Sequence, residues 1–335
     1  MNSGIHTAEC TSFMANKMGE KVVDVVVTSP PYDDLRDYEG FTFDCEKIAK
    51  GLYRVVKDGG VVVWVVGDRI NGGRTLTSFD HAFAFRAAGF TVYDAMIFKK
   101  RNTPFMRKGA YINCYEFMFV FSKGAPVTFN PLRSPSVRSG PAQVPYLKGP
   151  DGVNRKTEGE LSEHKVRTNI WSYAVGKNGT TSDMYAFKHP AMFPENLARD
   201  HILSWSNAGD LVFDPMCGAG TTCKMAKATG RRWLGVDVSS EYTSIAKRRL
   251  RGVKAESVPS PESRADPLDE PVAEDESVAV CRWCKREIPA ARTEATGGRA
   301  VTCSSECSRF NSRQRRNELK AEDRAKEKAR QDESS

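Results

Sequence analysis

Short runs of branched apolar residues alternate with longer segments of helical spacing over most of the chain. The Val-rich runs at residues 21–28 and 61–66 are too short for helices, and their continuity is typical of strands buried on both faces. Shorter apolar runs at 211–213 and 233–236 predict two more strands. Strands that alternate with helices indicate an α/β fold with an open, largely parallel sheet.

The segments between these strands carry apolar residues at the three- and four-residue spacing of one helix face. They are residues 45–56, 76–88, 195–205, 221–229 and 240–250. Residues 90–99 and 114–122 are instead rich in aromatic and β-branched residues. That composition predicts an antiparallel hairpin, which we expect at one edge of the sheet.

The rest of the chain lacks such periodicity. Residues 124–186 hold many Gly, Pro, Ser and basic residues, a composition typical of a functional insert or a disordered loop. Residues 252–279 combine Pro with acidic side chains and predict a disordered linker. We therefore expect a main domain at 1–251, the linker, a small cysteine module at 280–312 and a charged tail at 313–335.

Composition adds a basic bias to this picture. The 335 residues include 50 Lys and Arg against 42 Asp and Glu, a net charge of +8 that favours an acidic partner such as nucleic acid. Between Lys99 and Lys188, 15 basic residues stand against 6 acidic ones, although a solvated loop could carry such a run. No signal peptide or membrane span is evident, so we expect a cytoplasmic protein of prokaryotic or phage type that contacts no membrane.

The first candidate motif ends the first Val-rich run. It consists of Thr28, Ser29, Pro30, Pro31 and Tyr32. Two prolines end the hydrogen-bond ladder of a strand, at the carboxyl end where open α/β sheets bind ligands. The Ser29 hydroxyl and the Pro30 carbonyl can accept hydrogen bonds from an amino group, and Tyr32 offers a ring for stacking. An ordinary strand-to-loop turn would also use these residues.

The second motif follows the predicted strand at 211–213 and opens the helix at 221–229. It runs through Asp214, Pro215, Met216, Cys217, Gly218, Ala219, Gly220, Thr221 and Thr222. Its glycines let the backbone approach a ligand beside a helix N-terminus, and Asp237 after the next strand suits ribose hydroxyls. A dinucleotide site is the rival interpretation. Its fingerprint, however, needs a small residue where this chain has Cys223.

Together these motifs resemble the DNA amino-methyltransferases in which the catalytic motif precedes the cofactor motif, the β arrangement. The resemblance covers about residues 3–250 and includes Trp64–Asp68 and Lys188–Pro194. It implies the Rossmann-like sheet of S-adenosylmethionine-dependent methyltransferases with a rearranged motif order. It also implies double-stranded DNA as substrate and a target-recognition insert within about 99–186.

The resemblance further implies roles for individual residues. Methyl transfer would be direct, to the amine of a base flipped from the duplex, with the amine held by Ser29 and the Pro30 carbonyl. The implied catalytic residues are Ser29, Pro30, Pro31 and Tyr32. The implied S-adenosylmethionine contacts are Glu9, Thr28, Lys188, His189, Pro190, Phe193, Asp214, Pro215, Cys217, Gly218, Gly220, Thr221, Thr222 and Asp237. Glu9 departs from the family, which usually has Asp there.

Ser at position 29 resembles the subgroup that methylates N4 of cytosine. Asp at this position is found mostly in adenine-N6 enzymes, and Asn also in enzymes that methylate protein glutamine. We therefore expect cytosine-N4 methylation, with adenine-N6 methylation as the alternative. A protein-glutamine methyltransferase and a silent DNA-binding protein rank lower. The target sequence, a homodimer and a restriction enzyme partner are left open.

The last candidate site is a pair of cysteine pairs. Cys281 and Cys284 are separated by 18 residues from Cys303 and Cys307, a spacing that suits tetrahedral structural zinc. A segment this small needs a metal or another cross-link to fold, although four unrelated cysteines are the alternative. The other cysteines are Cys10, Cys45, Cys114, Cys217 and Cys223, which we expect to be reduced and at least partly buried.

Overall fold

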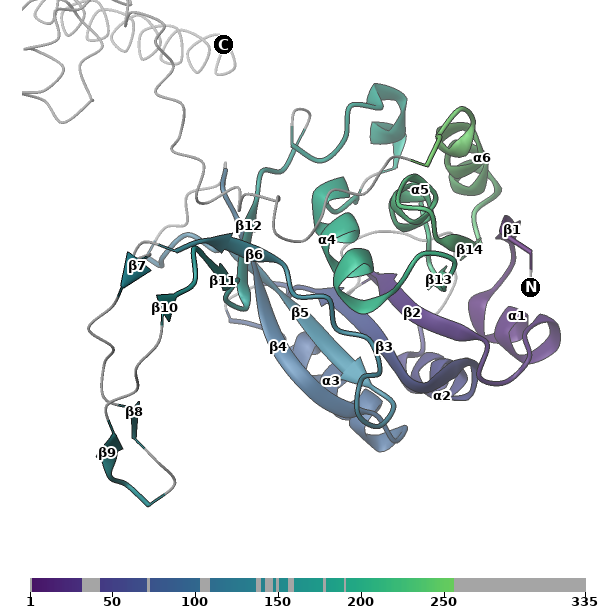
Figure 1. The fold of residues 1–335 in the computed structure, drawn as a ribbon. Helices are drawn as coiled ribbons and strands as arrows, with labels where there is room; N and C mark the ends of the chain where they lie inside the picture. Colours follow the sequence, from purple (N-terminus) through teal and green to yellow (C-terminus); the bar gives the residue numbers. More distant parts are fainter. Residues whose placement is uncertain are drawn as a thin grey trace, which may run out of the picture. The chain divides into compact units, whose positions relative to one another are not determined.

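The computed structural model describes residues 2–31, 43–70, 73–102, 109–136, 140–141, 147–148, 151–155, 160–176, 179–189 and 191–255. The largest sheet in this part of the chain has eight strands, and helices cover both of its faces (Figure 1). In spatial order the strands are β1 (Gly4–Thr7), β14 (Arg232–Asp237), β13 (Leu211–Asp214), β2 (Val23–Thr28), β3 (Val56–Val66), β5 (Tyr115–Ser122), β4 (Thr91–Lys100) and β12 (Ile170–Tyr173).

Every strand of this sheet except β5 runs in the same direction. The pairs β3/β5 and β4/β5 are antiparallel, and all other neighbours are parallel. The carboxyl ends of β2, β3, β13 and β14 therefore lie along one edge, which we call the carboxyl edge. The chain order is rearranged, because the strands that carry the proline and glycine motifs are neighbours in space but distant in sequence.

The Val-rich runs are central strands because both faces of the sheet are covered. Val26, Val62 and Trp64 pack toward α1 (Cys10–Lys17), α2 (Cys45–Val55) and α3 (Thr77–Ala87). Their sequence neighbours Val25 and Val63 pack toward α4 (Glu195–Trp205) and α5 (Thr221–Ala228) on the other face. Alternate residues of a strand point to opposite faces, so a strand with two covered faces must be apolar throughout.

The predicted helices α2 to α5 and α6 (Ser240–Leu250) all form, and they begin and end within one or two residues of the predicted bounds. Neither β1 nor α1 is predicted from the sequence. β1 lies at the edge of the sheet and buries only Ile5 fully, so it shows no apolar run. α1 has eight residues, too few for a clear helical period.

The predicted hairpin forms as the antiparallel pair β4/β5, but its expected place at the edge is wrong. β5 lies between β3 and β4, and β12 pairs with β4 beyond it. β3 also begins at Val56 rather than after Gly60. Gly59 is in the left-handed region at φ +76°, and a Cβ there would lie 2.3 Å from the Val127 side chain.

Residues 124–186, expected to be irregular, contain three nested antiparallel pairs (Figure 1). The pairs are β6 (Arg133–Pro135) with β11 (His164–Val166), β7 (Gly140–Pro141) with β10 (Glu160–Leu161), and β8 (Leu147–Lys148) with β9 (Asn154–Arg155). We call residues 133–166 the hairpin arm. The segment that follows the arm is bonded to α4, because both Arg167 and the Tyr173 hydroxyl of β12 donate to the Asp200 carboxylate at 3.1 and 2.7 Å.

The structure describes five of the nine cysteines. Cys10, Cys217 and Cys223 are buried, Cys45 and Cys114 are half-buried, and all five are reduced as expected. The four cysteines of the predicted zinc module, most of the linker and the charged tail lie outside the described residues. None of the described helices has the length and apolar character needed to cross a membrane.

Candidate active site

Two turns meet at the carboxyl edge because β2 and β13 are neighbours, with Val26 opposite Phe213. β2 ends at Thr28 and leads into the proline turn, residues 28–31. β13 ends at Asp214 and leads into the glycine loop, residues 214–222. The Thr28 hydroxyl donates to Oδ1 of Asp214 at 2.7 Å, and both side chains are buried. The two sequence motifs are thus joined directly.

Asp214 is a buried carboxyl group that accepts hydrogen bonds and has a shifted pKa. Burial raises its pKa to about 7, although hydrogen bonds from Thr28 and from the Met216 N–H act in the opposite direction. The nearby carboxylate of Asp237 raises the pKa further. A buried acid in this state would be stabilised in its charged form by a cationic ligand.

The glycine loop takes a conformation that requires its glycines. Gly218 and Gly220 both lie in the left-handed region, at φ +47° and +78°. A Cβ on Gly218 would lie 2.5 Å from Nε2 of His189, and one on Gly220 would lie 2.7 Å from Cβ of Ala246. The loop is therefore packed between the His189 segment and α6, and a side chain at either glycine would displace it.

Asp237 lies at the end of β14, as the sequence predicts, and contacts the glycine loop. Its Oδ2 accepts a hydrogen bond from the Gly218 N–H at 2.8 Å, and its Oδ1 accepts one from the Ser239 N–H at 3.0 Å. Burial raises the pKa of Asp237, and these two bonds lower it in part. A carboxylate has about four acceptor positions, so Asp237 can still accept bonds from two ligand hydroxyls.

Glu9 caps helix α1. Its carboxylate accepts bonds from the Thr11 and Ser12 N–H groups at 2.8 and 2.7 Å, and from the Thr11 hydroxyl. Burial acts to raise the pKa of Glu9, but these hydrogen bonds outweigh it and lower the pKa to about 2. A carboxylate fits this position whether or not it contacts a ligand, because it satisfies N–H groups at the start of the helix.

The segment before α4 contributes one residue to this cluster. His189 follows η2 (Met184–Lys188), packs against Gly218 and contacts the Tyr242 ring at 4.4 Å between centroids. Lys188 is exposed, and Phe193 packs against the core beneath α4 and α5. Of the predicted residues here, only His189 is brought onto the glycine loop. Tyr32 and Pro190 lie outside the described residues.

The remaining predicted residues have structural partners. Pro215 and Cys217 are buried in the glycine loop, and the Thr222 hydroxyl donates to the Val27 carbonyl at 2.9 Å. Thr221 accepts a bond from Arg249 at 3.0 Å. In the proline turn, Pro30 is buried while Ser29 and Pro31 are half-buried.

Arg249 is a residue that the motifs do not reveal. It stands in a basic run at the end of α6, where a solvated role would be the simplest interpretation. Its spacing is the one available signal: it follows Ile245 by four residues and Ala246 by three, and both of these are buried. Helical periodicity therefore places Arg249 on the inner face of α6.

Known proteins resemble this chain over most of its length. A family model described as DNA methylase, for N6 and N4 methyltransferases, matches residues 23–248. The chain is 47% identical over 244 residues to the orphan methyltransferase M.BamHII of Bacillus amyloliquefaciens, which covers 71% of this chain and 92% of that protein. It is 27% identical over 242 residues to the DNA adenine methyltransferase YhdJ of Escherichia coli K12, covering 70% and 78%.

A solved structure shares the fold. The PvuII DNA methyltransferase, described as cytosine-N4-specific, superposes with a TM-score of 0.55 over 78% of this chain and 89% of that chain. The two sequences are 18% identical, so this likeness concerns the arrangement of strands and helices alone.

The raised pKa of Asp214 predicts how Asp214→Asn changes stability with pH. Well below pH 3.8, the ordinary pKa of Asp, the carboxyl group is neutral in both the folded and the unfolded chain. As the pH rises toward 7, the unfolded chain ionises while the folded chain keeps the proton, which destabilises the fold. Asn keeps an acceptor oxygen but cannot ionise. The Tm of Asp214→Asn relative to that of the parent protein should therefore be higher at pH 8 than at pH 5.

Thermal unfolding of the ligand-free protein at the two pH values measures this difference. Asp80→Asn, at an exposed position on α3, is the control and should show no comparable dependence. An Asp214→Asn effect that is equal at both pH values, or less favourable at pH 8, would contradict the assignment of a buried carboxyl group with a raised pKa.

Proposed function

The chain belongs to the N6/N4 family of DNA methyltransferases, and from this premise we propose that it methylates N4 of cytosine in DNA. It is an S-adenosylmethionine-dependent DNA methyltransferase with either N4-cytosine or N6-adenine specificity. The observation that carries the choice of cytosine is Ser29 at the head of the proline turn, where adenine-N6 enzymes mostly have Asp. Adenine-N6 methylation is the alternative that the experiment below distinguishes.

The proposed cofactor position follows the glycine loop. Gly218 and Gly220 would bind the methionine part, and Asp237 the ribose hydroxyls, for which it has acceptor positions available. Asp214 supports this assignment, because its buried carboxyl group would ionise more readily beside a cationic ligand. S-adenosylmethionine supplies a methyl group on a positively charged sulfur. The acceptor positions of Asp237 and the buried carboxyl group of Asp214 therefore support this cofactor position.

In the proposed reaction, Ser29 and Pro30 hold the base. The Ser29 hydroxyl and the Pro30 carbonyl would accept hydrogen bonds from the exocyclic amine and draw its lone pair out of conjugation with the ring. Orientation supplies much of the rate in a direct transfer, so the proline turn must be held in place. The bond from Thr28 to Asp214 supports that requirement, since it connects the turn to the glycine loop at 2.7 Å. Tyr32 would stack on the flipped base.

The proposed DNA contacts lie in the segment between Lys99 and Lys188, with the hairpin arm as the target-recognition part. The excess of basic over acidic residues in this segment supports contacts with phosphate groups. The bonds from Arg167 and Tyr173 to Asp200 support a fixed base for the arm. An arm that reads a target sequence must be anchored to the domain that carries the chemistry.

Identification of the methylated nucleoside tests the choice of base. The purified protein is incubated with unmethylated DNA and S-adenosylmethionine labelled in its methyl group, and the DNA is digested to nucleosides. We expect the label in N4-methyldeoxycytidine. Label in N6-methyldeoxyadenosine would overturn the cytosine assignment.

Ser29→Ala should lower kcat by about 100-fold with little change in DNA affinity, because the lost hydrogen bond strengthens in the transition state.

Ser244→Ala is the matched control for Ser29→Ala, because its hydroxyl is exposed on α6 and bonded to the Ser240 carbonyl. It should retain the parental kcat. An unchanged kcat for Ser29→Ala would remove Ser29 from the reaction and leave the proline turn an ordinary strand-to-loop turn.

We also propose that Cys281, Cys284, Cys303 and Cys307 bind one structural zinc ion. Their spacing supports this, and the described residues contain no cluster of three potential metal ligands. Elemental analysis of the full chain should give about one zinc per molecule. Cys281→Ser and Cys303→Ser should each lower that content, whereas the half-buried Cys45→Ser should leave it unchanged. A full chain that purifies without zinc would contradict the proposal.

A further inference from the structure

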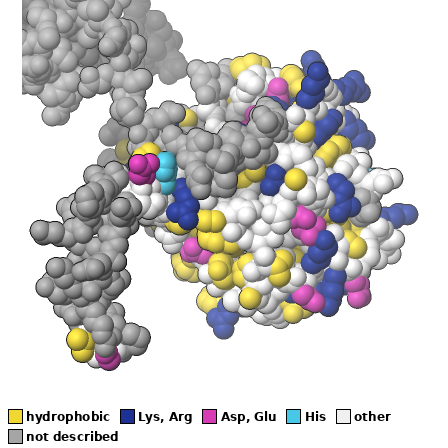
Figure 2. Space-filling model, in the orientation of Figure 1, with side chains coloured by type: hydrophobic (Ala, Val, Ile, Leu, Met, Phe, Trp, Pro, Cys, Tyr) yellow, Lys and Arg dark blue, Asp and Glu magenta, His cyan; other side chains and the backbone are white. Residues whose placement is uncertain are grey.

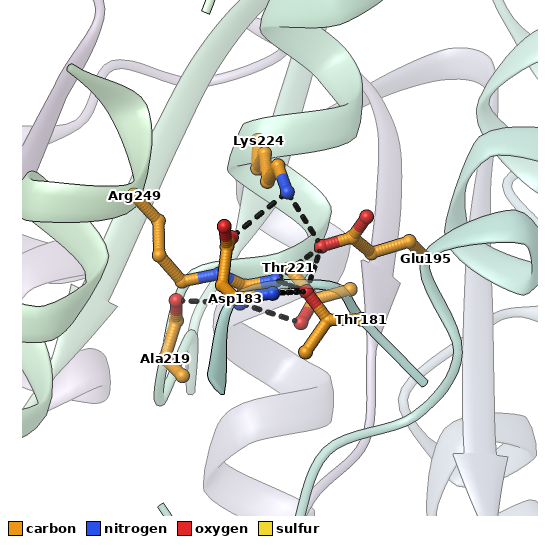
Figure 3. A network of polar contacts seen from close by, with 7 residues as sticks. All are labelled: Thr181, Asp183, Glu195, Ala219, Thr221, Lys224 and Arg249. Carbon is orange, nitrogen blue, oxygen red and sulfur yellow. Dashed lines mark hydrogen bonds and ion pairs between the residues drawn. The ribbon is translucent and has the colours of Figure 1, made fainter. Parts of the chain in front are cut away.

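A buried arginine connects the glycine loop to two other segments (Figure 3). Arg249 lies near the end of α6, and its side chain is 0% exposed. Each of its five N–H groups has an acceptor. Nε donates to Asp183 at 2.9 Å, and Nη1 donates to the Ala219 carbonyl at 2.8 Å and to Thr221 Oγ1 at 3.0 Å. Nη2 donates to Thr181 Oγ1 at 3.2 Å and to the Glu195 carboxylate at 2.5 Å. The guanidinium group is therefore fully hydrogen-bonded.

A second cation completes this cluster. Lys224 of α5 contacts the carboxylates of Asp183 and Glu195, each at 2.8 Å. Figure 3 shows both carboxylates pointing toward the two cations. Burial acts to raise the pKa of Asp183, but bonds from Lys224 and Arg249 outweigh it and lower the pKa. The cluster thus pairs two basic side chains with two carboxylates.

This cluster lies between the glycine loop and the segment that leads to His189. Ala219 lies between Gly218 and Gly220, so the bond from Arg249 fixes the central peptide of the glycine loop. Asp183 and Thr181 precede His189, the residue that packs against Gly218. One guanidinium group thus holds both sides of the proposed cofactor position. Buried ion pairs add little net stability, so a precise network of this kind suggests a role beyond stability.

We propose that Arg249 is a positioning residue for cofactor binding. A loop with two glycines in the left-handed region has many other conformations available, and a ligand that must order it binds more weakly. Arg249 orders the loop and the His189 segment before the cofactor arrives. This inference rests on the proposed cofactor position, and it is independent of which base receives the methyl group.

The geometry requires arginine and not merely a positive charge. Lysine has a single nitrogen with three donors and cannot span acceptors on α4, α5, the glycine loop and the segment before η2. The neighbouring basic residues of α6, Lys247 and Arg248, are exposed, and Lys and Arg side chains gather at the surface over this helix (Figure 2). Arg249 alone of the three is directed inward, with 3% of the residue exposed.

Arg249→Lys tests the proposal against a matched control. Arg231 is also buried and donates to the Thr229 and Ser206 carbonyls at 2.6 and 2.7 Å, but it precedes β14 at the edge opposite the glycine loop. Arg231→Lys should lower Tm by an amount similar to Arg249→Lys. Calorimetry without DNA then measures the affinity of each variant for S-adenosylmethionine and for the demethylated product, S-adenosylhomocysteine.

We expect Arg249→Lys to raise both Kd values by at least tenfold and by similar factors, because the change affects the shape of the site and not a charge at the sulfur. KM for S-adenosylmethionine should rise in parallel. The value of kcat at saturating cofactor should stay within about threefold of that of the parent protein, and the affinity for DNA should stay within about twofold. Arg231→Lys should leave both cofactor affinities unchanged.

Unchanged cofactor affinity in Arg249→Lys would overturn the proposal and leave Arg249 a stabilising residue like Arg231. An equal loss of cofactor affinity in Arg231→Lys would also overturn it, because the effect would then follow general destabilisation.

If Arg249→Lys does not fold, the cofactor affinity of Thr181→Val tests the proposal instead. This substitution removes a hydroxyl that accepts bonds from Arg249 and the Asp183 N–H and donates one to Glu195, without changing charge, and it should raise both Kd values about threefold or more. No change in Thr181→Val would count against the proposal. Because binding is measured without DNA, an incorrect cytosine assignment would not affect the result.

Discussion

A buried hydrogen bond from the Thr28 hydroxyl to the Asp214 carboxyl group joins two motifs that are 186 residues apart in the chain. It exists because β2 and β13 are adjacent parallel strands that end at the same edge of the sheet. Both strands are buried on both faces, which places them in the interior of the sheet, and Val26 lies opposite Phe213. The site is therefore built by the packing of the sheet, and its two turns are held in register by one short bond.

The two groups of charges near the glycine loop are arranged in opposite ways. Behind the loop, Arg249 and Lys224 are paired with the carboxylates of Asp183 and Glu195. In front of it, no described cation is paired with the buried Asp214, and its pKa is raised to about 7. This contrast is consistent with the proposed cofactor position, because the charged form of a buried carboxyl group is stabilised by a cationic ligand.

Much of the fold could be predicted because its central elements carry strong patterns. The helices have clear apolar faces, and the buried strands are continuous runs of Val. β1 and β12 could not be predicted, because each has only four residues, too few to show a period. Of the site, Asp214, Gly218 and Asp237 could be identified from motif spacing. The helix cap formed by Glu9, the bond from Thr222 to Val27 and the contacts of Arg249 depend on tertiary packing, which motif spacing does not encode.

The proposed alignment of base and cofactor depends most directly on the link between the proline turn and the glycine loop. The measurement that tests it is the rate of methyl transfer to DNA by Thr28→Val and Thr28→Ser at saturating DNA and S-adenosylmethionine. Val keeps the shape of Thr28 but loses the hydroxyl, so kcat should fall at least tenfold while Tm changes by only a few degrees. Ser keeps the hydroxyl and should restore most of the rate. A parental kcat for Thr28→Val would contradict the claim that this bond holds the two substrates in line.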